Sequence, residues 1–196
     1  RPPAAAGTMR RVAISVQGIL DRDGKGLRWS PIQRLAGTPF AEHLSEARNL
    51  PVTLHKRGRL LAEGARWLDP ALHDASVATV FVGSTVAMGV TFRGQIMGRG
   101  DEGASEFGHM NHLPNGALCR CGSKGCIEAY CGFYGLLRAA FEVPINTIPA
   151  KFVPVAEVEK IAASARSGNR MAAFAFRQAG LALGNGLSRL FSLHGN

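Results

Sequence analysis

Short apolar runs separated by turn residues dominate the first half of the chain, and longer helical segments dominate the second half. The β-branched run 11–16 predicts a strand, and Asp-Gly and Lys-Gly pairs between apolar positions predict a hairpin over 20–29. Further strands are expected at 50–54, 77–82, 86–92 and 95–97, the last two pairing around Arg93-Gly94. Helices are expected at 38–49, 59–68, 127–141, 155–165 and 169–193.

The long helix expected near the end of the chain contains three glycines, Gly180, Gly184 and Gly186. Glycine lowers helix stability, so we expect these positions to pack closely against a neighbouring element. Strands and a hairpin followed by a helical second half predict a two-lobed α/β protein. We place a partial first lobe at residues 9–62 and a second lobe at residues 63–196.

Composition indicates a globular chain, since 46% of the residues are hydrophobic and 19% are charged. Neither a secretory signal nor an apolar span of ~18 residues is evident, so we expect a soluble, cytoplasmic protein that makes no membrane contact. The net charge of +9 comes from basic residues scattered between Arg10 and Arg189 without a dense run. This scatter favours a basic solvated surface over a nucleic-acid-binding face.

All four cysteines lie between positions 119 and 131, within or just after a long polar loop at 98–125. Cys119, Cys121 and Cys126 follow a C-x-C-x4-C spacing, which favours metal ligation over disulfides in a chain without a signal peptide. Cys131 is a weaker candidate because it falls on an expected helix. Three thiolates therefore form the core of a predicted metal site.

Tetrahedral zinc needs a fourth ligand beside the three thiolates. His109, ten positions before Cys119, completes a Cys3His set, and His112 is the rival fourth ligand. Four protein ligands predict a structural zinc ion that orders the loop. A basic zinc module that binds nucleic acid is an alternative interpretation, although only Arg120 and Lys124 lie beside the cysteines as it requires.

Two carboxylates and an imidazole, those of Glu106, His109 and Glu128, bracket the segment that a zinc ion would order. Such groups, when held rigidly together, can bind several vicinal hydroxyls of a sugar. Each glutamate taken singly is equally compatible with a solvated surface charge. Taken together, the three residues predict a sugar-binding cleft.

The stretch Glu106-Phe-Gly-His109, followed by Gly-x-x-Cys-x-Cys-Gly-x-x-Gly-Cys-x-Glu from Gly116 to Glu128, resembles the signature of the ROK family. This family comprises sugar-responsive repressors, open reading frames and sugar kinases. The residues 17–21 and Pro51-Val52 also resemble segments of the family's first lobe. The resemblance implies an actin-like, ribonuclease-H-like two-lobed α/β fold, apparently incomplete at both ends.

The resemblance also implies a ligand and partners. Glu106, His109 and Glu128 are expected to contact a hexose or a hexose derivative, with His109 serving as a zinc ligand as well. We expect a homo-oligomer. DNA binding is expected only through a domain that is not present in this chain, since repressors of the family carry a winged helix-turn-helix ahead of the sugar lobe.

The sequence departs from the family pattern at the position of the catalytic base. Kinases of the family place an Asn-Asp pair after the strand that resembles 50–54, and the aspartate is the general base for the sugar hydroxyl. Here the matching stretch, 55–59, contains Lys56 and Arg57. An arginine cannot accept a proton at any usable pH, so no catalytic residue is predicted at Arg57.

The phosphate-binding segments depart from the pattern as well. The glycine-rich loop of the family resembles 83–89, in which Thr85, Ala87 and Met88 replace glycines. No Asp-x-Gly-Gly-Thr segment precedes Arg11, and a further glycine-rich turn would lie beyond the last residue. These differences favour a zinc-containing, regulator-like sugar sensor without kinase activity. The alternative is an ATP-dependent hexose kinase.

Overall fold

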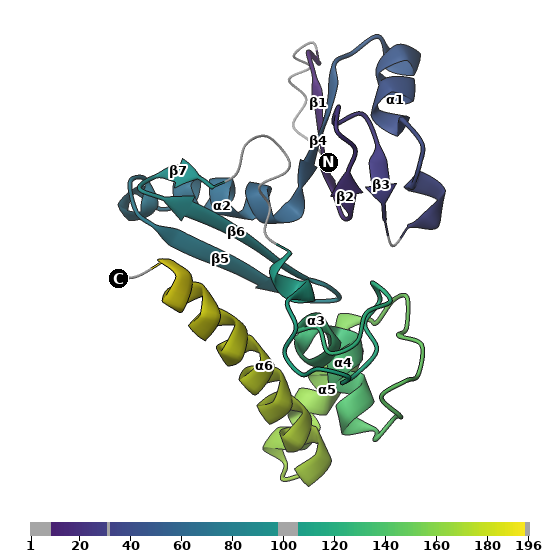
Figure 1. Ribbon diagram of the computed structural model, residues 1–196, viewed down its shortest axis with the longest axis vertical. Helices are drawn as coiled ribbons and strands as arrows, with labels where there is room; N and C mark the ends of the chain where they lie inside the picture. Colours follow the sequence, from purple (N-terminus) through teal and green to yellow (C-terminus); the bar gives the residue numbers. More distant parts are fainter. Residues whose placement is uncertain (1–8, 31, 98–105, 195–196) are drawn as a thin grey trace.

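The computed structural model describes residues 9–30, 32–97 and 106–194, with the side chains of 193 and 194 left out. Two small sheets and a helix form the N-terminal region (Figure 1). Their elements are β1 (Val12–Val16), β2 (Ile19–Leu20), β3 (Leu27–Trp29), η1 (Gln33–Leu35), α1 (Phe40–Arg48) and β4 (Val52–Lys56). β1 pairs in parallel with β4, and β2 pairs antiparallel with β3, so the expected first strand and hairpin are confirmed.

The core of this region is small and apolar. Alternate residues of the strands point inward, as the period of two in a β-strand requires. Leu27 and Leu54 are almost fully buried, at 1% and 2% exposure. The buried members of this core are Val16, Leu20, Leu27, Ala41 and Leu54.

Helix α2 (Arg57–Leu68) begins at the residue that follows β4, so Lys56 ends the strand and Arg57 begins the helix. It packs against β5 and β6, and a Cβ at Gly58 or at Gly89 would overlap the backbone of the other segment. The boundary expected between residues 62 and 63 lies within α2, and the division into two lobes stays a prediction.

A three-stranded antiparallel sheet follows η2 (Pro70–Leu72) and consists of β5 (Val77–Val82), β6 (Val86–Phe92) and β7 (Gln95–Ile96). β5 pairs with β6 from Val77↔Thr91 to Val82↔Val86. Arg93 and Gly94 have φ of 48° and 73°, which suits the tight turn expected between β6 and β7. At the other end of the β5–β6 pair, the short turn at 83–85 points toward the C-terminal helices (Figure 1).

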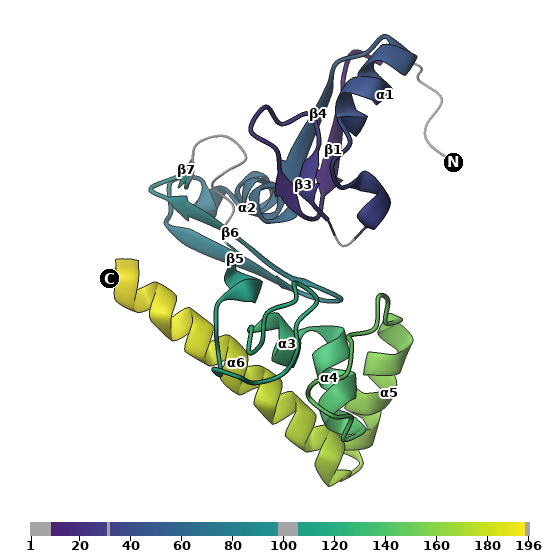
Figure 2. The same ribbon diagram turned by 45° about the vertical axis from the view of Figure 1, so that its right-hand side comes forward.

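In the second half of the described chain, a loop leads into a helical region (Figure 2). It contains η4 (Phe107–His109), α3 (Glu128–Cys131), α4 (Phe133–Ala140), α5 (Val155–Arg166) and α6 (Arg170–His194). α6 packs against α3, α4 and α5. Asn169 caps it, since its Oδ1 accepts a hydrogen bond from the Ala172 amide at 2.9 Å.

The prediction of a single helix over 127–141 is wrong. Gly132 adopts an extended conformation, with ψ of 158°, and divides the segment into α3 and α4. The Phe133 amide, which begins α4, donates instead to the Gly83 carbonyl at 2.9 Å. A contact with the β5–β6 turn thus replaces continuous helix and joins the helices to the sheet.

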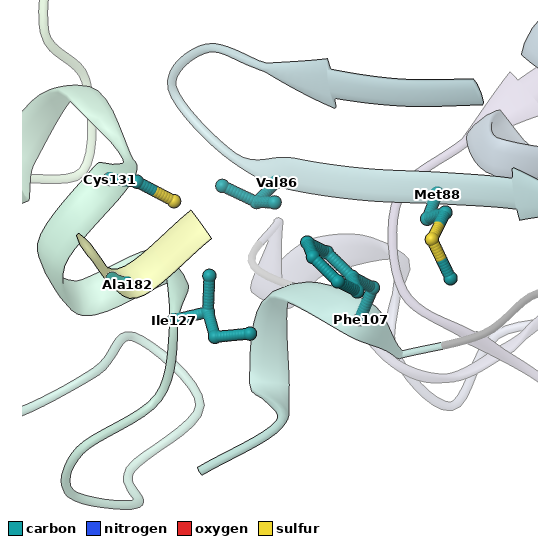
Figure 3. Packing of buried hydrophobic residues seen from close by; sticks show 6 residues of the cluster. All are labelled: Val86, Met88, Phe107, Ile127, Cys131 and Ala182. Carbon is teal, nitrogen blue, oxygen red and sulfur yellow. The ribbon is translucent and has the colours of Figure 1, made fainter. Parts of the chain in front are cut away.

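A second core lies between the sheet and the helices. Figure 3 shows Val86 and Met88 of β6 facing Phe107, Ile127 and Cys131, with Ala182 of α6 close by. Phe107 and Ile127 are fully buried, at 0% exposure. Their sequence neighbours are Glu106 and Glu128, so this core sets the positions of both carboxylates.

The expectation that the glycines of α6 pack closely is right at one position only. A Cβ at Gly186 would lie 2.5 Å from Cδ1 of Ile127 and 2.8 Å from Cζ of Phe107. At Gly180 and Gly184 nothing among the described residues would lie within 4 Å of a Cβ, so the expectation is wrong there. Among the described residues, no helix combines the length and the apolar character that crossing a membrane requires.

Candidate metal centre and adjoining cleft

Four side chains of the long loop converge at one point. The ligand atoms of His109, Cys119, Cys121 and Cys126 all lie within 4.8 Å of one another. His109 ends η4, and the three cysteines come from the segment before α3. The predicted Cys3His cluster could therefore hold a metal ion.

Two glycine turns bring the sulfur atoms together. Gly122 has φ of 89°, and its amide donates to the Cys119 carbonyl at 3.0 Å, which closes a turn around Cys121. Gly125 has φ of 82°, and a Cβ there would overlap the Leu113 carbonyl. Only glycine suits this second turn, because positive φ and close backbone approach coincide. Cys126 thereby returns toward the first two cysteines.

Two of the distances between the ligand atoms match tetrahedral zinc. Zn–S bonds of about 2.3 Å and Zn–N bonds of about 2.0–2.1 Å at tetrahedral angles separate two sulfurs by about 3.8 Å, and sulfur from nitrogen by about 3.6 Å. Sγ of Cys121 and Sγ of Cys126 are 3.7 Å apart. Sγ of Cys119 and Nδ1 of His109 are 3.6 Å apart. The residues thus fit a zinc ion in their chemistry and in these two distances.

The two weaker candidate ligands lie elsewhere. Nδ1 of His112 is 3.2 Å from Nδ2 of Asn185, and its ring packs edge-on against Tyr130. Cys131 belongs to the core between the sheet and the helices. Of the two histidines, the structure therefore brings His109 to the three cysteines.

Burial alters the acidity of the thiols. Burial raises the pKa of Cys119 to about 11 and also raises the pKa of Cys126, where the neighbouring sulfurs add to the effect. Without a metal these thiols hold their protons at neutral pH, so metal binding releases protons. The Tyr134 hydroxyl donates to Sγ of Cys119 at 3.3 Å, a contact with the cluster that sequence reasoning missed.

A cleft adjoins the metal cluster and contains all three residues predicted to bind sugar. Its wall comes from β1, β3, the β4–α2 junction, the β5–β6 turn and β6, together with Glu106, His109 and Glu128. The cleft has a volume of about 70 Å³, well below the ~300–1,000 Å³ of typical small-molecule sites. Its lining residues are Val16, Gln17, Gly18, Trp29, Lys56, Arg57, Gly58, Thr85, Val86, Ala87, Met88, Glu106, His109 and Glu128.

The two carboxylates of the cleft have different environments. Glu128 is buried, at 2% exposure, and its Oε2 accepts a hydrogen bond from the Val86 amide at 2.9 Å. Its Oε1 lies 3.4 Å from the Tyr134 hydroxyl. Glu106 is more exposed, and its Oε1 forms an ion pair with Nζ of Lys56 at 2.8 Å. Glu128 is thus held by the Val86 amide and the Tyr134 hydroxyl, whereas Glu106 is held by Lys56.

Arg57 crosses the cleft to the β5–β6 turn. Its Nη1 donates to Oγ1 of Thr85 at 3.2 Å, and its guanidinium lies 5.3 Å from the centre of the Phe81 ring. Sequence reasoning identified Lys56 and Arg57 as residues that replace the Asn-Asp pair of the family's kinases. It did not predict their contacts with Glu106 and Thr85. The charges alone were the available signal, because Lys56 and Glu106 are 50 residues apart.

The α/β architecture recurs in solved sugar-kinase structures. A ROK family glucokinase from Streptomyces griseus, in complex with glucose and AMPPNP, matches with a TM-score of 0.71 and 26% identity. The match covers 94% of this chain and 62% of that chain. The expected actin-like α/β fold class is therefore confirmed over that part.

The chain belongs to the ROK family, whose model matches residues 2–194. The glucokinase of Streptomyces coelicolor is 28% identical over 192 residues, which is 93% of this chain and 60% of the relative. The xylose repressor of Bacillus subtilis is 28% identical over 129 residues, which is 65% of this chain and 33% of the relative. The chain thus spans 60% or less of these relatives, and both kinases and repressors occur among them.

Proposed function

We propose that the chain is the sugar-binding part of a regulator-like ROK protein without kinase activity, and that His109, Cys119, Cys121 and Cys126 hold a structural zinc ion. The family and the glucose in the Streptomyces griseus complex support the ligand class. The converging ligand atoms and their spacing support the metal. Zinc would order the loop that carries His109 beside the cleft.

The ion pair between Lys56 and Glu106 is the observation that carries this proposal. If the resemblance to the family holds at this position, Lys56-Arg57 replaces an Asn-Asp pair whose second residue is the general base. A general base contributes about 10²–10⁴-fold to a rate, and neither cation supplies one here. Lys56 also engages the Glu106 carboxylate, so a neutral sugar must compete with an ammonium group for it.

His109 would serve the metal and the ligand through different ring atoms. Its Nδ1 is the atom that lies 3.6 Å from Sγ of Cys119. A metal on Nδ1 leaves the proton on Nε2, which becomes a hydrogen-bond donor for a hydroxyl. Glu128, held by the Val86 amide, supplies an acceptor on the same wall.

A charged sugar suits this cleft better than a neutral one. Arg57 and Lys56 both line the cleft, and a guanidinium binds carboxylate or phosphate through two parallel hydrogen bonds. A charge-assisted hydrogen bond shielded from water contributes about 1.5–3 kcal/mol. We therefore expect glucose 6-phosphate or a sugar acid to bind about ten to a hundred times more tightly than glucose.

Calorimetric titration of glucose and glucose 6-phosphate tests the ligand class. Arg57→Ala should weaken binding of the phosphate and leave glucose nearly unchanged, whereas Glu106→Ala should affect both sugars. Equal affinities for the two sugars, unchanged by Arg57→Ala, would remove the charged-ligand proposal. Failure of every sugar to bind would remove the sugar-binding function itself.

A coupled assay with ATP, magnesium and a panel of hexoses and acetylated hexosamines tests the absence of kinase activity. We expect background rates, with the Streptomyces coelicolor glucokinase as positive control. The competing function is an ATP-dependent hexose kinase, which the 28% identity to that enzyme over 93% of the chain favours. Turnover that disappears in Glu63→Gln would establish the kinase and place its base on α2.

A further inference from the structure

Arg138 of α4 is a buried cation without a counter-charge. It is 7% exposed, and no ion pair within the described residues includes it. Its Nη2 donates to the Thr147 carbonyl at 3.0 Å, but its Nη1 has no hydrogen-bond partner in the described part of the chain. Burial of an unpaired charge is costly, so this position favours an anion nearby.

A cavity of about 520 Å³ opens beside Arg138. It lies between α4, α6 and the segment that precedes α5, and its size is that of a typical small-molecule site. Most of its wall is apolar. The lining residues that matter below are Arg138, Tyr130, Ala139, Glu142 and Phe174.

Two further polar groups line the cavity. The Tyr130 hydroxyl accepts a hydrogen bond from the Ala117 amide at 2.9 Å, and its own hydrogen has no partner within the described residues. Glu142 supplies the carboxylate on the wall, but it is exposed and forms no described ion pair with Arg138. Arg138, the Tyr130 hydroxyl and the Glu142 carboxylate are thus polar groups on a mostly apolar wall.

We propose that this cavity binds a small apolar monocarboxylate. The apolar body of such a ligand would cover the wall around Phe174, and its carboxylate would supply the counter-charge that Arg138 lacks. Tyr130 would donate a second hydrogen bond. None of the cavity residues lines the cleft beside the metal cluster, so the two sites are separate and are tested separately.

Calorimetric titration with matched acid and alcohol probes tests the proposal. Octanoate and phenylpropanoate should bind the full chain at millimolar concentrations or below, and each should bind more tightly than octanol or phenylpropanol. Arg138→Met removes the charge and keeps the length of the side chain. It should weaken binding of the acids about tenfold to a hundredfold and change binding of the alcohols little. Glu142→Gln should strengthen acid binding, because it removes a like charge.

Several outcomes would overturn the proposal. They are equal binding of acids and alcohols, acid binding unaffected by Arg138→Met, or no acid binding at millimolar concentrations. If Arg138→Met does not fold, Ala139→Phe decides the matter, since it fills the cavity from a partly exposed position and leaves Arg138 in place. Loss of acid binding in Ala139→Phe supports the cavity, and retention of acid binding excludes it.

Discussion

Gly186 is a position of close contact between α6 and the core that carries the cleft carboxylates, and Gly186→Ala tests this packing. The added Cβ would lie 2.5 Å from Cδ1 of Ile127 and 2.8 Å from Cζ of Phe107. Both side chains are fully buried, so neither has free space into which to move. Because Glu106 precedes Phe107 and Glu128 follows Ile127, we expect relief of the overlap to shift the cleft carboxylates.

Two opposing effects determine the magnitude. Alanine favours a helix over glycine by about 1 kcal/mol, whereas an extra methyl in a packed core costs about 1–3 kcal/mol. Because the methyl of Gly186→Ala would contact two buried side chains, its packing cost should lie near the upper end of this range. The free energy of unfolding should therefore fall by about 1–2 kcal/mol after the gain in helix propensity is subtracted. Among the described residues nothing lies within 4 Å of a Cβ at Gly180, so Gly180→Ala should show only the gain in helix propensity.

The assay is thermal and urea unfolding of the two variants beside the wild type. A free-energy change of 1 kcal/mol shifts the Tm of a chain of this size by about 2–4 °C, so the variants should move in opposite directions and be clearly resolved. Sugar titration of Gly186→Ala should also show weaker binding, with Gly180→Ala as the matched control. A Gly186→Ala protein as stable as Gly180→Ala would refute the packing argument.

Three further predictions concern the metal centre, the cleft and the core. Cys121→Ser should release the metal and lower stability, because loop order and metal binding are coupled; elemental analysis of the wild type showing well under one zinc per chain would contradict this. Lys56→Asn should free the Glu106 carboxylate and tighten glucose binding in calorimetry, and an unchanged affinity would show that the ion pair does not compete with the sugar. Burial raises the pKa of Cys131 from 9.0 to about 12, so the unfolded chain releases this proton first. The free energy of unfolding should therefore be insensitive to this thiol below pH 9 and fall as the pH rises from 9 to about 12. The free energy of unfolding of Cys131→Ala should fall less steeply over that pH range, and identical slopes for the variant and the wild type would exclude the effect.

The sequence by itself determined the chemistry of the candidate metal centre. Cys119, Cys121 and Cys126 lie within eight consecutive residues, and Gly122 and Gly125 supply the turns that fold this segment back on itself. Such features depend on neighbouring residues, so spacing predicts them. The antiparallel pairing around Arg93-Gly94 was predictable for the same reason.

Only the tertiary structure decided which groups these local features meet. The sequence favoured His109 as the fourth ligand and left His112 as its rival, and the structure brings His109 to the cysteines while His112 contacts Asn185. The break at Gly132 depends on the Gly83 carbonyl, which lies 50 positions from Phe133 in the sequence. The spacing of apolar residues in α3 and α4 does not indicate such a partner.

The same limit applies to charge and to glycine. Gly180 and Gly186 lie on one helix, but only Gly186 meets the buried side chains of Phe107 and Ile127. Lys56 and Glu106 come together from opposite sides of the cleft across 50 residues. Residue type and spacing determine local conformation and ligand chemistry, whereas ion pairs, close packing and burial arise from contacts between distant segments, which only the folded chain specifies.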